Sequence, residues 1–205
     1  MSTKDNTLKI ILNKLNLFNK NVLDLGPGSG RWLDYIKKFN PNQIYAADFS
    51  LKIKAKCKKK VDEFKIINFE NGKIDFKSNS MDIIMVIEVL EHIRNYKSFL
   101  KELIRISKSG GVLIFTIPNI CSFISRVRLL FGLLPVAIAS DDTHVNFFRK
   151  KEILKEFKLL KQNVKFYSSS FSINIFNPKS KFRFKSFSFL SMFDDSYIFV
   201  VKVQK

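Results

Sequence analysis

Three glycines at alternate positions, Gly26, Gly28 and Gly30, directly follow the apolar run "NVLDL" and its acidic residue Asp24. Glycine at such a turn permits positive φ angles and lets bare backbone approach a ligand closely at the start of a helix. A second acidic residue, Asp48, ends the run "QIYAAD" about 20 residues later, where a carboxylate can accept hydrogen bonds from both hydroxyls of a ribose. The pattern predicts a turn that binds a nucleoside-containing ligand.

The spacing of the glycines distinguishes this turn from two common glycine-rich loops. The dinucleotide fingerprint requires a glycine three residues after its second glycine, and that position holds Arg31. A P-loop requires a Gly-Lys-Ser/Thr ending, which the turn lacks. The sequence therefore disfavours a nicotinamide-dependent oxidoreductase and excludes a P-loop protein.

A second group of reactive side chains follows the apolar run "MDIIMVI". The stretch "EVLEHI" places Glu88, Glu91 and His92 at the end of that run. The stretch "DDTHVNFF" supplies His144, the other of the two histidines in the chain. Two carboxylates and two imidazoles could bind a divalent ion that acidifies a hydroxyl group. Alternatively, His144 acts on a substrate without a metal, or the group only packs the loops around it.

The pattern of apolar residues predicts the elements that carry both groups. A first helix is expected over residues 4–17, and helices follow over 31–39, 51–60, 96–108 and 150–160. The helix over 96–108 is expected to end at a glycine cap, Gly110-Gly111. Strands are expected over 21–25, 43–48, 64–69, 81–87, 112–117, 164–173 and 196–204.

Strands that alternate with helices at this pitch predict an α/β fold with a doubly wound, mostly parallel sheet and helices on both faces. The last two strands follow one another without a predicted helix, so we expect them to pair as an antiparallel edge of that sheet. No repeat or low-complexity linker divides the sequence, and we predict one domain over residues 1–205.

Four stretches resemble, in order, the successive motifs of class I S-adenosylmethionine (SAM)-dependent methyltransferases, EC 2.1.1.-. They are "VLDLGPGSGRWLDYI", "IYAADFS", "FKSNSMDIIMVIEVLEHIRN" and "ELIRISKSGGVLIFTIPN". The resemblance covers a SAM-binding core over residues 20–120, with a looser likeness to the end of the chain. It implies a Rossmann-like sheet of seven strands with an antiparallel last strand, and SAM as the methyl donor.

The resemblance also implies roles for individual residues. Asp24 and the three glycines would line the methionine end of SAM, and Asp48 would hold the ribose hydroxyls. Phe49 would lie beside the adenine. The acidic position that bonds the adenine amino group falls on Glu70, followed by Asn71; aspartate is the commoner residue there.

For the reaction itself, the resemblance places Glu88 near the amino acid part of SAM and near the acceptor. We expect Glu88 and His144 to act on the acceptor, since transfer to a hydroxyl requires loss of a proton. Glu-x-x-Glu-His with a later histidine also resembles the magnesium site of ubiquinone-pathway O-methyltransferases and of enzymes that methylate the terminal 2′-hydroxyl of small RNAs. "EVLEH" is equally widespread in class I methyltransferases that use no metal, and we assign no metal ligand from the sequence.

Two further segments bear on the acceptor. Residues 120–148 form an insertion in which Ile124, Val127, Phe131 and Leu134 fall roughly on one helical face. A lid over an apolar acceptor, a helix on a membrane surface and a helix packed on the core all fit, and the last is slightly favoured. In residues 178–193 basic and aromatic residues alternate. Such a segment could bind single-stranded RNA or a lipid interface, but an edge hairpin is favoured.

The composition sets the remaining expectations. The net charge of +18 fits either a polyanionic partner or, more simply, the lysine-rich composition of an AT-biased genome. The start lacks an apolar secretion signal and the two cysteines are far apart, which together predict a cytoplasmic protein. We expect methyl transfer to a hydroxyl of a small-molecule or lipid-like acceptor, with peripheral membrane contact compatible with that function. The alternatives are a metal-dependent RNA 2′-O-methyltransferase, with nucleic acid less favoured as partner, and a catalytically silent SAM-fold binding protein.

Overall fold

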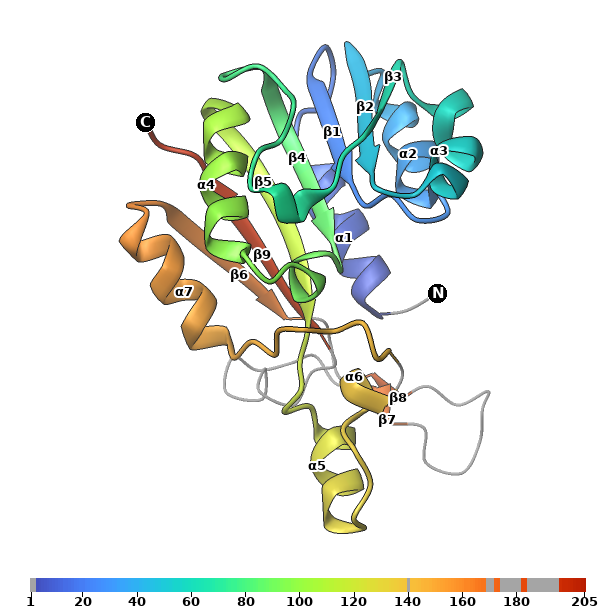
Figure 1. Cartoon of the computed structure of the whole chain (residues 1–205), viewed down its shortest axis with the longest axis vertical. Coiled ribbons are helices and arrows are strands. Elements are labelled where there is room, and N and C mark those ends of the chain that lie inside the picture. The colour runs from blue at the N-terminus through green and yellow to red at the C-terminus, as the bar shows by residue number, and fades with distance from the viewer. Residues whose placement is uncertain (1–2, 140, 169–171, 174–181, 184–195) are drawn as a thin grey trace.

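Seven strands form one mixed sheet in the computed structural model, which describes residues 3–139, 141–168, 172–173, 182–183 and 196–205 (Figure 1). The order of the strands is β3-β2-β1-β4-β5-β9-β6. Their bounds are β1 (Asn21–Leu25), β2 (Gln43–Asp48), β3 (Glu63–Ile66), β4 (Met81–Ile87), β5 (Ser107–Pro118), β6 (Asn163–Ser168) and β9 (Ser196–Lys202). Strands β1 to β5 pair in parallel, and β9 is antiparallel to both of its neighbours, β5 and β6. The predicted fold class is confirmed, including the antiparallel last strand.

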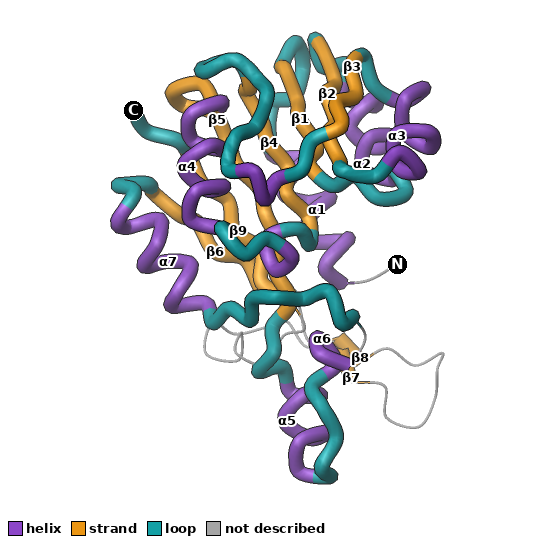
Figure 2. The backbone as a smooth tube through the Cα atoms, viewed as in Figure 1, coloured by secondary structure: helices purple, strands orange, loops and turns teal. Residues whose placement is uncertain are grey.

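Helices cover both faces of this sheet (Figure 2). On one face lie α1 (Thr3–Lys14), α2 (Arg31–Ile36) and α3 (Leu51–Cys57), and on the other lie α4 (Tyr96–Ile106) and α7 (Lys150–Leu159). Two further helices, α5 (Phe123–Leu130) and α6 (Val136–Ala139), lie beyond the end of the sheet. Single 3₁₀ turns occur at Lys37–Phe39, Lys58–Lys60, Phe69–Asn71 and Leu90–His92.

The central strands β1 and β4 are largely apolar because both faces of the sheet are buried there. In β4, Ile83 and Met85 pack against the α1, α2 and α3 side, while Ile84 and Val86 pack against α4 and α7. On the latter side the ring of Phe115 stacks at 5.2 Å from Phe157 of α7 and at 4.9 Å from Phe199 of β9. This stack joins the predicted parallel core to the C-terminal strands.

One predicted helix end is wrong. Helix α4 stops at Ile106, and β5 already begins at Ser107. Between the pairs Met81↔Ser107 and Ile83↔Val112 the two strands change register, so Gly110 and Gly111 lie in an irregularity of β5 rather than at a helix cap. Gly110 has a φ of 76°, and a side chain at Gly111 would come within 2.9 Å of the Lys108 carbonyl oxygen. Both glycines are therefore required by the strand.

Three smaller boundaries also differ from the prediction. The first helix ends at Lys14, and β3 ends at Ile66, because Phe69–Asn71 turns into a 3₁₀ helix. The expected strand over 164–173 is two strands: β6 ends at Ser168, and β7 (Ser172–Ile173) pairs with β8 (Phe182–Arg183) in a separate two-stranded sheet. That pairing agrees with an antiparallel hairpin, and the rest of the basic and aromatic segment 178–193 lies outside the described residues.

The expectation that the inserted helix packs on the core is also wrong. Helix α5 projects away from the sheet, at the bottom of Figure 1. It ends at Leu130, and Gly132, with a φ of 71°, reverses the chain, so Phe131 and Leu134 are not part of a helical face. Both side chains are largely exposed. Periodicity in the sequence could not show this, because it does not register where a glycine breaks the helix.

Among the residues that the structure describes, no helix has the length and apolar character needed to cross a bilayer.

Candidate functional site

The turn between β1 and α2 requires its three glycines for two reasons, close packing and backbone conformation. A Cβ at Gly26 would lie 2.4 Å from the Val89 Cγ2 atom, and a Cβ at Gly30 would lie 2.9 Å from the Cys57 sulfur. These two glycines let neighbouring loops and helices pack against the turn. Gly28 has a φ of 53° and open space where a side chain would begin, so its conformation rather than its packing selects glycine.

Asp24, at the end of β1, is a buried acid short of hydrogen bonds. Its Oδ2 atom has no hydrogen-bond partner within the described part of the chain. Burial raises the pKa of Asp24 to about 8, and the nearby charge of Asp48 adds to the effect. A buried carboxyl that lacks a partner is costly unless a ligand pairs with it. The site therefore fits a ligand that carries a cationic group.

The carboxyl ends of β2 and β3 bring two more acidic residues to the same edge. Asp48 accepts a hydrogen bond from the Ser50 backbone N–H at 2.8 Å, and burial raises the pKa of Asp48. Glu70 accepts a hydrogen bond from the Arg94 backbone N–H at 2.9 Å through its Oε1 atom. Each carboxylate is thus oriented by backbone from a neighbouring loop.

Gly26, Gly28, Asp48 and Glu70 border a cavity of about 520 Å³, which we call the cofactor cavity. It is lined by Gly26, Gly28, Asp48, Phe49, Asn68, Phe69, Glu70, Glu88, Val89, His92, Ile93 and Thr143. Phe49 lies at its rim with 72% of its surface exposed. Next to it, a space of about 160 Å³ is bounded by Asp24, Arg31 and Glu88 among others.

Three residues predicted for this site do not line the cofactor cavity itself, and one of them, Asp24, borders only the adjoining space. Asn71 is absent from its wall, and Asn68 stands there instead, because the chain turns into a 3₁₀ helix at Phe69. Gly30 is also absent from the walls of both spaces and serves the packing of α2 against α3. Asn68 was missed because counting along a predicted strand cannot place a residue within a turn.

Glu88 lies directly after β4 and has a strained, left-handed backbone conformation, with a φ of 55°. Its backbone N–H donates to the Thr116 hydroxyl at 3.1 Å, and its carboxylate forms an ion pair with Lys4 of α1. Positive φ in a residue other than glycine costs energy and is common where a side chain must be aimed at a site. Here the side chain borders both the cofactor cavity and a second cavity.

The second cavity, which we call the acceptor cavity, has a volume of about 540 Å³. It shares Glu88 and His92 with the cofactor cavity. Its other lining residues are Glu91, Pro118, Asn119, Ser122, Ile124, Ser125, Val136, Ala137, Asp141, His144 and Ser196. The polar residues of this wall, Asn119, Ser122 and Ser125, were not predicted from the sequence, since nothing in their spacing suggests a ligand.

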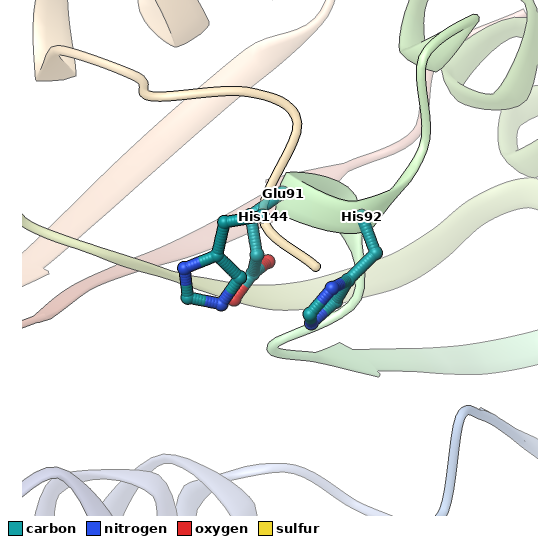
Figure 3. Close-up of side chains that lie close together, drawn as sticks. All are labelled: Glu91, His92 and His144. Atoms are coloured by element: carbon teal, nitrogen blue, oxygen red, sulfur yellow. The ribbon is translucent and has the colours of Figure 1, made fainter. Parts of the chain in front are cut away.

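Glu91, His92 and His144 meet in the wall of the acceptor cavity (Figure 3). One ligand atom from each lies within 4.8 Å of the others. Glu91 is 1% exposed, and neither of its carboxylate oxygens has a hydrogen-bond partner among the described residues. Burial, followed by repulsion from Glu88, raises the pKa of Glu91 to about 8. Glu88 is not part of this cluster, so the group of four ligands considered from the sequence is reduced to three.

The two imidazoles are held in defined orientations by backbone and by Thr143. His144 places Nδ1 at 2.6 Å from the Ala137 carbonyl oxygen and therefore donates a hydrogen bond there. His92 places Nδ1 at 2.9 Å from the Thr143 hydroxyl, which in turn donates to Asp141 at 2.5 Å. Each ring thus carries its proton on Nδ1 and keeps Nε2 as an acceptor.

Thr143 and Asp141 are functional neighbours that the sequence prediction missed. Asp141 also lies 3.9 Å from the Nε2 atom of His144, so one carboxylate faces both imidazoles. The signal was present in "DDTHVNFF", where an acid and a hydroxyl directly precede the histidine. The buried Glu91 with two free oxygens and two Nε2 acceptors forms a donor set that suits a divalent cation.

Comparison with known proteins identifies the family of the chain. A family profile described as "Methyltransferase domain" matches residues 4–160. The uncharacterized protein MJ0638 of Methanocaldococcus jannaschii is 40% identical over 106 residues, which cover 51% of this chain and 44% of that protein. The "Probable S-adenosylmethionine-dependent methyltransferase Rv3030" of Mycobacterium tuberculosis is 23% identical over 134 residues, or 65% of this chain and 43% of that protein. The match spans less than half of the length of either relative.

Solved structures share the fold at low sequence identity. A chain assigned as a methyltransferase, in complex with the Haloferax volcanii Trm112 methyltransferase activator, superposes with a TM-score of 0.74 and 17% identity, over 99% of this chain and 92% of that chain. A SAM-dependent methyltransferase from Archaeoglobus fulgidus gives a TM-score of 0.70 and 16% identity, over 96% and 93%. The domain profile covers most of the sequence and the sheet order is that of the fold. The chain therefore belongs to the class I SAM-dependent methyltransferases, whose methyl donor is SAM.

Proposed function

We propose that the protein transfers the methyl group of SAM to a hydroxyl oxygen of a small-molecule or lipid-like acceptor held in the acceptor cavity. One observation carries the proposal: Glu88 and His92 form a wall common to the cofactor cavity and the acceptor cavity. A methyl donor in one and a hydroxyl in the other would face each other across these two side chains. His144 lies on the acceptor side of that wall.

In this proposal the acidic edge of the sheet binds the donor. Asp24 pairs with the ammonium group of the methionine part, and Asp48 accepts the two ribose hydroxyls. Phe49 covers the adenine, whose amino group donates to the Glu70 oxygen that the Arg94 N–H leaves available. The orphaned oxygen of Asp24 and the carboxylates on two successive strand ends support these assignments.

The residues of the acceptor cavity remove the proton of the acceptor hydroxyl. SAM supplies a methyl group already activated by its sulfonium charge, so the protein has to orient the acceptor and remove its hydroxyl proton. The Nε2 atom of His144 takes that proton as the oxygen attacks the methyl carbon. The Ala137 carbonyl, bonded to Nδ1, and Asp141, at 3.9 Å from Nε2, stabilise the imidazolium that forms. Glu88 positions the reacting groups from the shared wall.

A second candidate is metal-assisted transfer, and the two unpartnered oxygens of buried Glu91 favour it. Glu91, His92 and His144 would hold a divalent cation, and the chemistry supplied by that cation is a lower pKa of the acceptor hydroxyl. An RNA 2′-hydroxyl would be an acceptor of this kind.

The test uses SAM labelled on its methyl group, with purified protein and fractionated cell extract. Label is expected in the organic-soluble or small-molecule fraction, and His144→Ala should abolish it while binding of the product, S-adenosylhomocysteine, persists. Label that appears in RNA and disappears with a chelator would instead support the metal-assisted candidate. A protein that binds neither SAM nor its product would refute both and leave a silent SAM-fold protein.

A further inference from the structure

The segment from residue 123 to residue 136 forms a projecting hairpin, which we call the tip hairpin (Figure 1). It consists of α5, the turn at Gly132 and the loop that leads back to the start of α6. Its large apolar side chains are exposed instead of packed: Phe123, Ile124, Leu129, Leu130, Phe131, Leu133, Leu134 and Val136. Leu130 and Phe131, at the end farthest from the sheet, are 84% and 77% exposed.

Hydrogen bonds within the tip hairpin hold it in this form. The Arg128 guanidinium donates through Nε to the Leu134 carbonyl oxygen at 2.7 Å. The Leu133 N–H donates to the Arg128 carbonyl at 2.9 Å, and the Gly132 N–H donates to the Leu129 carbonyl at 3.0 Å. The hairpin therefore presents its apolar side chains on a preformed scaffold. An exposed apolar cluster of this size indicates a binding surface.

We propose that the tip hairpin inserts into the surface of a lipid bilayer that contains anionic lipids. The first argument is charge. Residues 119–139 contain two arginines, Arg126 and Arg128, and no acidic residue, and the whole chain carries a net charge of +18. Apolar side chains flanked by arginine are the combination that binds anionic membrane surfaces, through burial in the acyl boundary and attraction to the headgroups.

The second argument is shape. The tip hairpin stands away from the sheet (Figure 2), and its apolar side chains are exposed. It is shorter than the roughly 20–30 residues that one side of an ordinary protein interface needs. A narrow projecting end offers little area to a flat protein surface, but a bilayer can surround it on all sides.

The third argument is continuity with the acceptor cavity. Ile124 and Val136 belong to the exposed apolar surface of the tip hairpin and also line the acceptor cavity. An apolar molecule that leaves the bilayer along Ile124 and Val136 would arrive at the cavity that contains His144. The acceptor is accordingly a lipid that carries a free hydroxyl. This last step rests on the proposed function, whereas bilayer binding does not.

Vesicle co-sedimentation tests the binding. The protein is expected to sediment with vesicles of equal phosphatidylcholine and phosphatidylglycerol, and far less with phosphatidylcholine alone. The double variant Leu130→Glu/Phe131→Glu should bind the anionic vesicles more than tenfold less tightly, because it removes two side chains that would be buried in lipid. The matched control, Phe18→Glu/Leu159→Glu, makes the same change at two side chains that are each 66% exposed elsewhere, and should bind like the natural protein.

A fluorescence measurement reports the depth of insertion. The chain has one tryptophan, Trp32 of α2, which is buried and gives a constant background. In a Phe131→Trp variant the emission should shift to the blue on addition of anionic vesicles and be quenched by lipids brominated on their acyl chains. The natural protein should show neither change.

Three results would overturn the inference. They are no binding to anionic vesicles, equal binding by the natural protein and the tip variant, or a natural protein that is a dimer in solution and becomes a monomer only in the tip variant. The last would mean that a second copy covers the hairpin. Calorimetry of S-adenosylhomocysteine binding on the same samples separates these failures from failure of the proposed function, because the cofactor cavity does not include the tip hairpin. Methyl label recovered only from water-soluble material, despite vesicle binding, would overturn the lipid acceptor.

Discussion

Binding of SAM is expected to release close to one proton, because the unliganded protein keeps the Asp24 carboxyl protonated. Burial and the neighbouring Asp48 raise the pKa of Asp24 to about 8. At pH 7 a group with this pKa is protonated in about 0.9 of the molecules. The ammonium group of SAM requires the carboxylate form as its partner, so the proton must leave when the ligand binds.

The same argument fixes how affinity changes with pH. Between pH 6 and pH 7 the carboxylate fraction of a group with a pKa of 8 rises about ninefold, and the affinity for SAM should rise by about the same factor. Calorimetry at pH 7 in buffers of low and high ionisation enthalpy measures the released protons directly. The slope of apparent enthalpy against buffer enthalpy should correspond to about 0.9 proton for the natural protein.

Two variants make this test specific to Asp24. In Asp24→Asn the released proton should disappear, and the affinity should fall at pH 8 far more than at pH 6, where the natural protein is itself mostly protonated. Asp34→Asn makes the same substitution at an exposed residue of α2 that borders neither the cofactor cavity nor the adjoining space, and should leave proton release unchanged. Equal proton release by the natural protein and by Asp24→Asn would refute the assignment of the ammonium partner.

The remaining predictions concern the acceptor cavity, the turn and the core. Burial raises the pKa of Glu91 from an ordinary value of 4.5 to about 8, so the folded protein holds this proton more tightly than the unfolded chain. The resulting contribution to the free energy of unfolding is fully present below pH 4.5 and is lost as pH rises toward 8. Urea unfolding should therefore show stability falling between pH 5 and pH 7, and Glu91→Gln should flatten the slope by up to about 1.4 kcal/mol per pH unit. Gly26→Ala should destabilise the protein more than Gly28→Ala, since only the former pushes a Cβ to 2.4 Å from Val89; equal losses would contradict this. Phe157→Ala should cost about 3–5 kcal/mol in the same assay, because it empties one side of the ring stack on Phe115.

The fold was predictable because its signals are local and repeated. Each strand of the parallel sheet is an apolar run with a turn at its end, and each covering helix has an apolar face, so errors in one element do not spread to the next. The prediction errors occur where a glycine is compatible with more than one local structure, such as a helix cap or an irregularity in a strand. Gly110 and Gly111 look like a helix cap in the sequence, but the partner strand β4 shifts register there and draws them into β5. Pairing of distant strands decides such positions, and no local pattern records it.

The candidate site was predictable for residues at strand ends and not for residues whose place depends on loops. Asp24 and Asp48 lie at the carboxyl ends of β1 and β2, Glu88 directly follows β4, and the carboxyl ends of parallel strands meet at one edge. His144 has no such anchor, yet it lies against His92 with 4.7 Å between the ring centroids.

The loop that carries His144 is held by backbone hydrogen bonds, which do not depend on the type of residue and so cannot be predicted from the sequence. The backbone N–H groups of Val145 and Asn146 both donate to the Glu91 carbonyl oxygen, at 2.9 and 3.0 Å. These two bonds attach the end of the insertion to the turn after β4, and so bring His144 to His92 and the Glu91 side chain. A variant that loosens this attachment should separate the histidines while leaving the glycine turn and Asp48 of the cofactor cavity in place. Asn146→Ala is the change to make, because the Asn146 amide also donates to the Ile93 carbonyl at 2.6 Å. It should lower methyl transfer while leaving S-adenosylhomocysteine affinity within about twofold; a parallel loss of both would show that the two cavities are built as one unit.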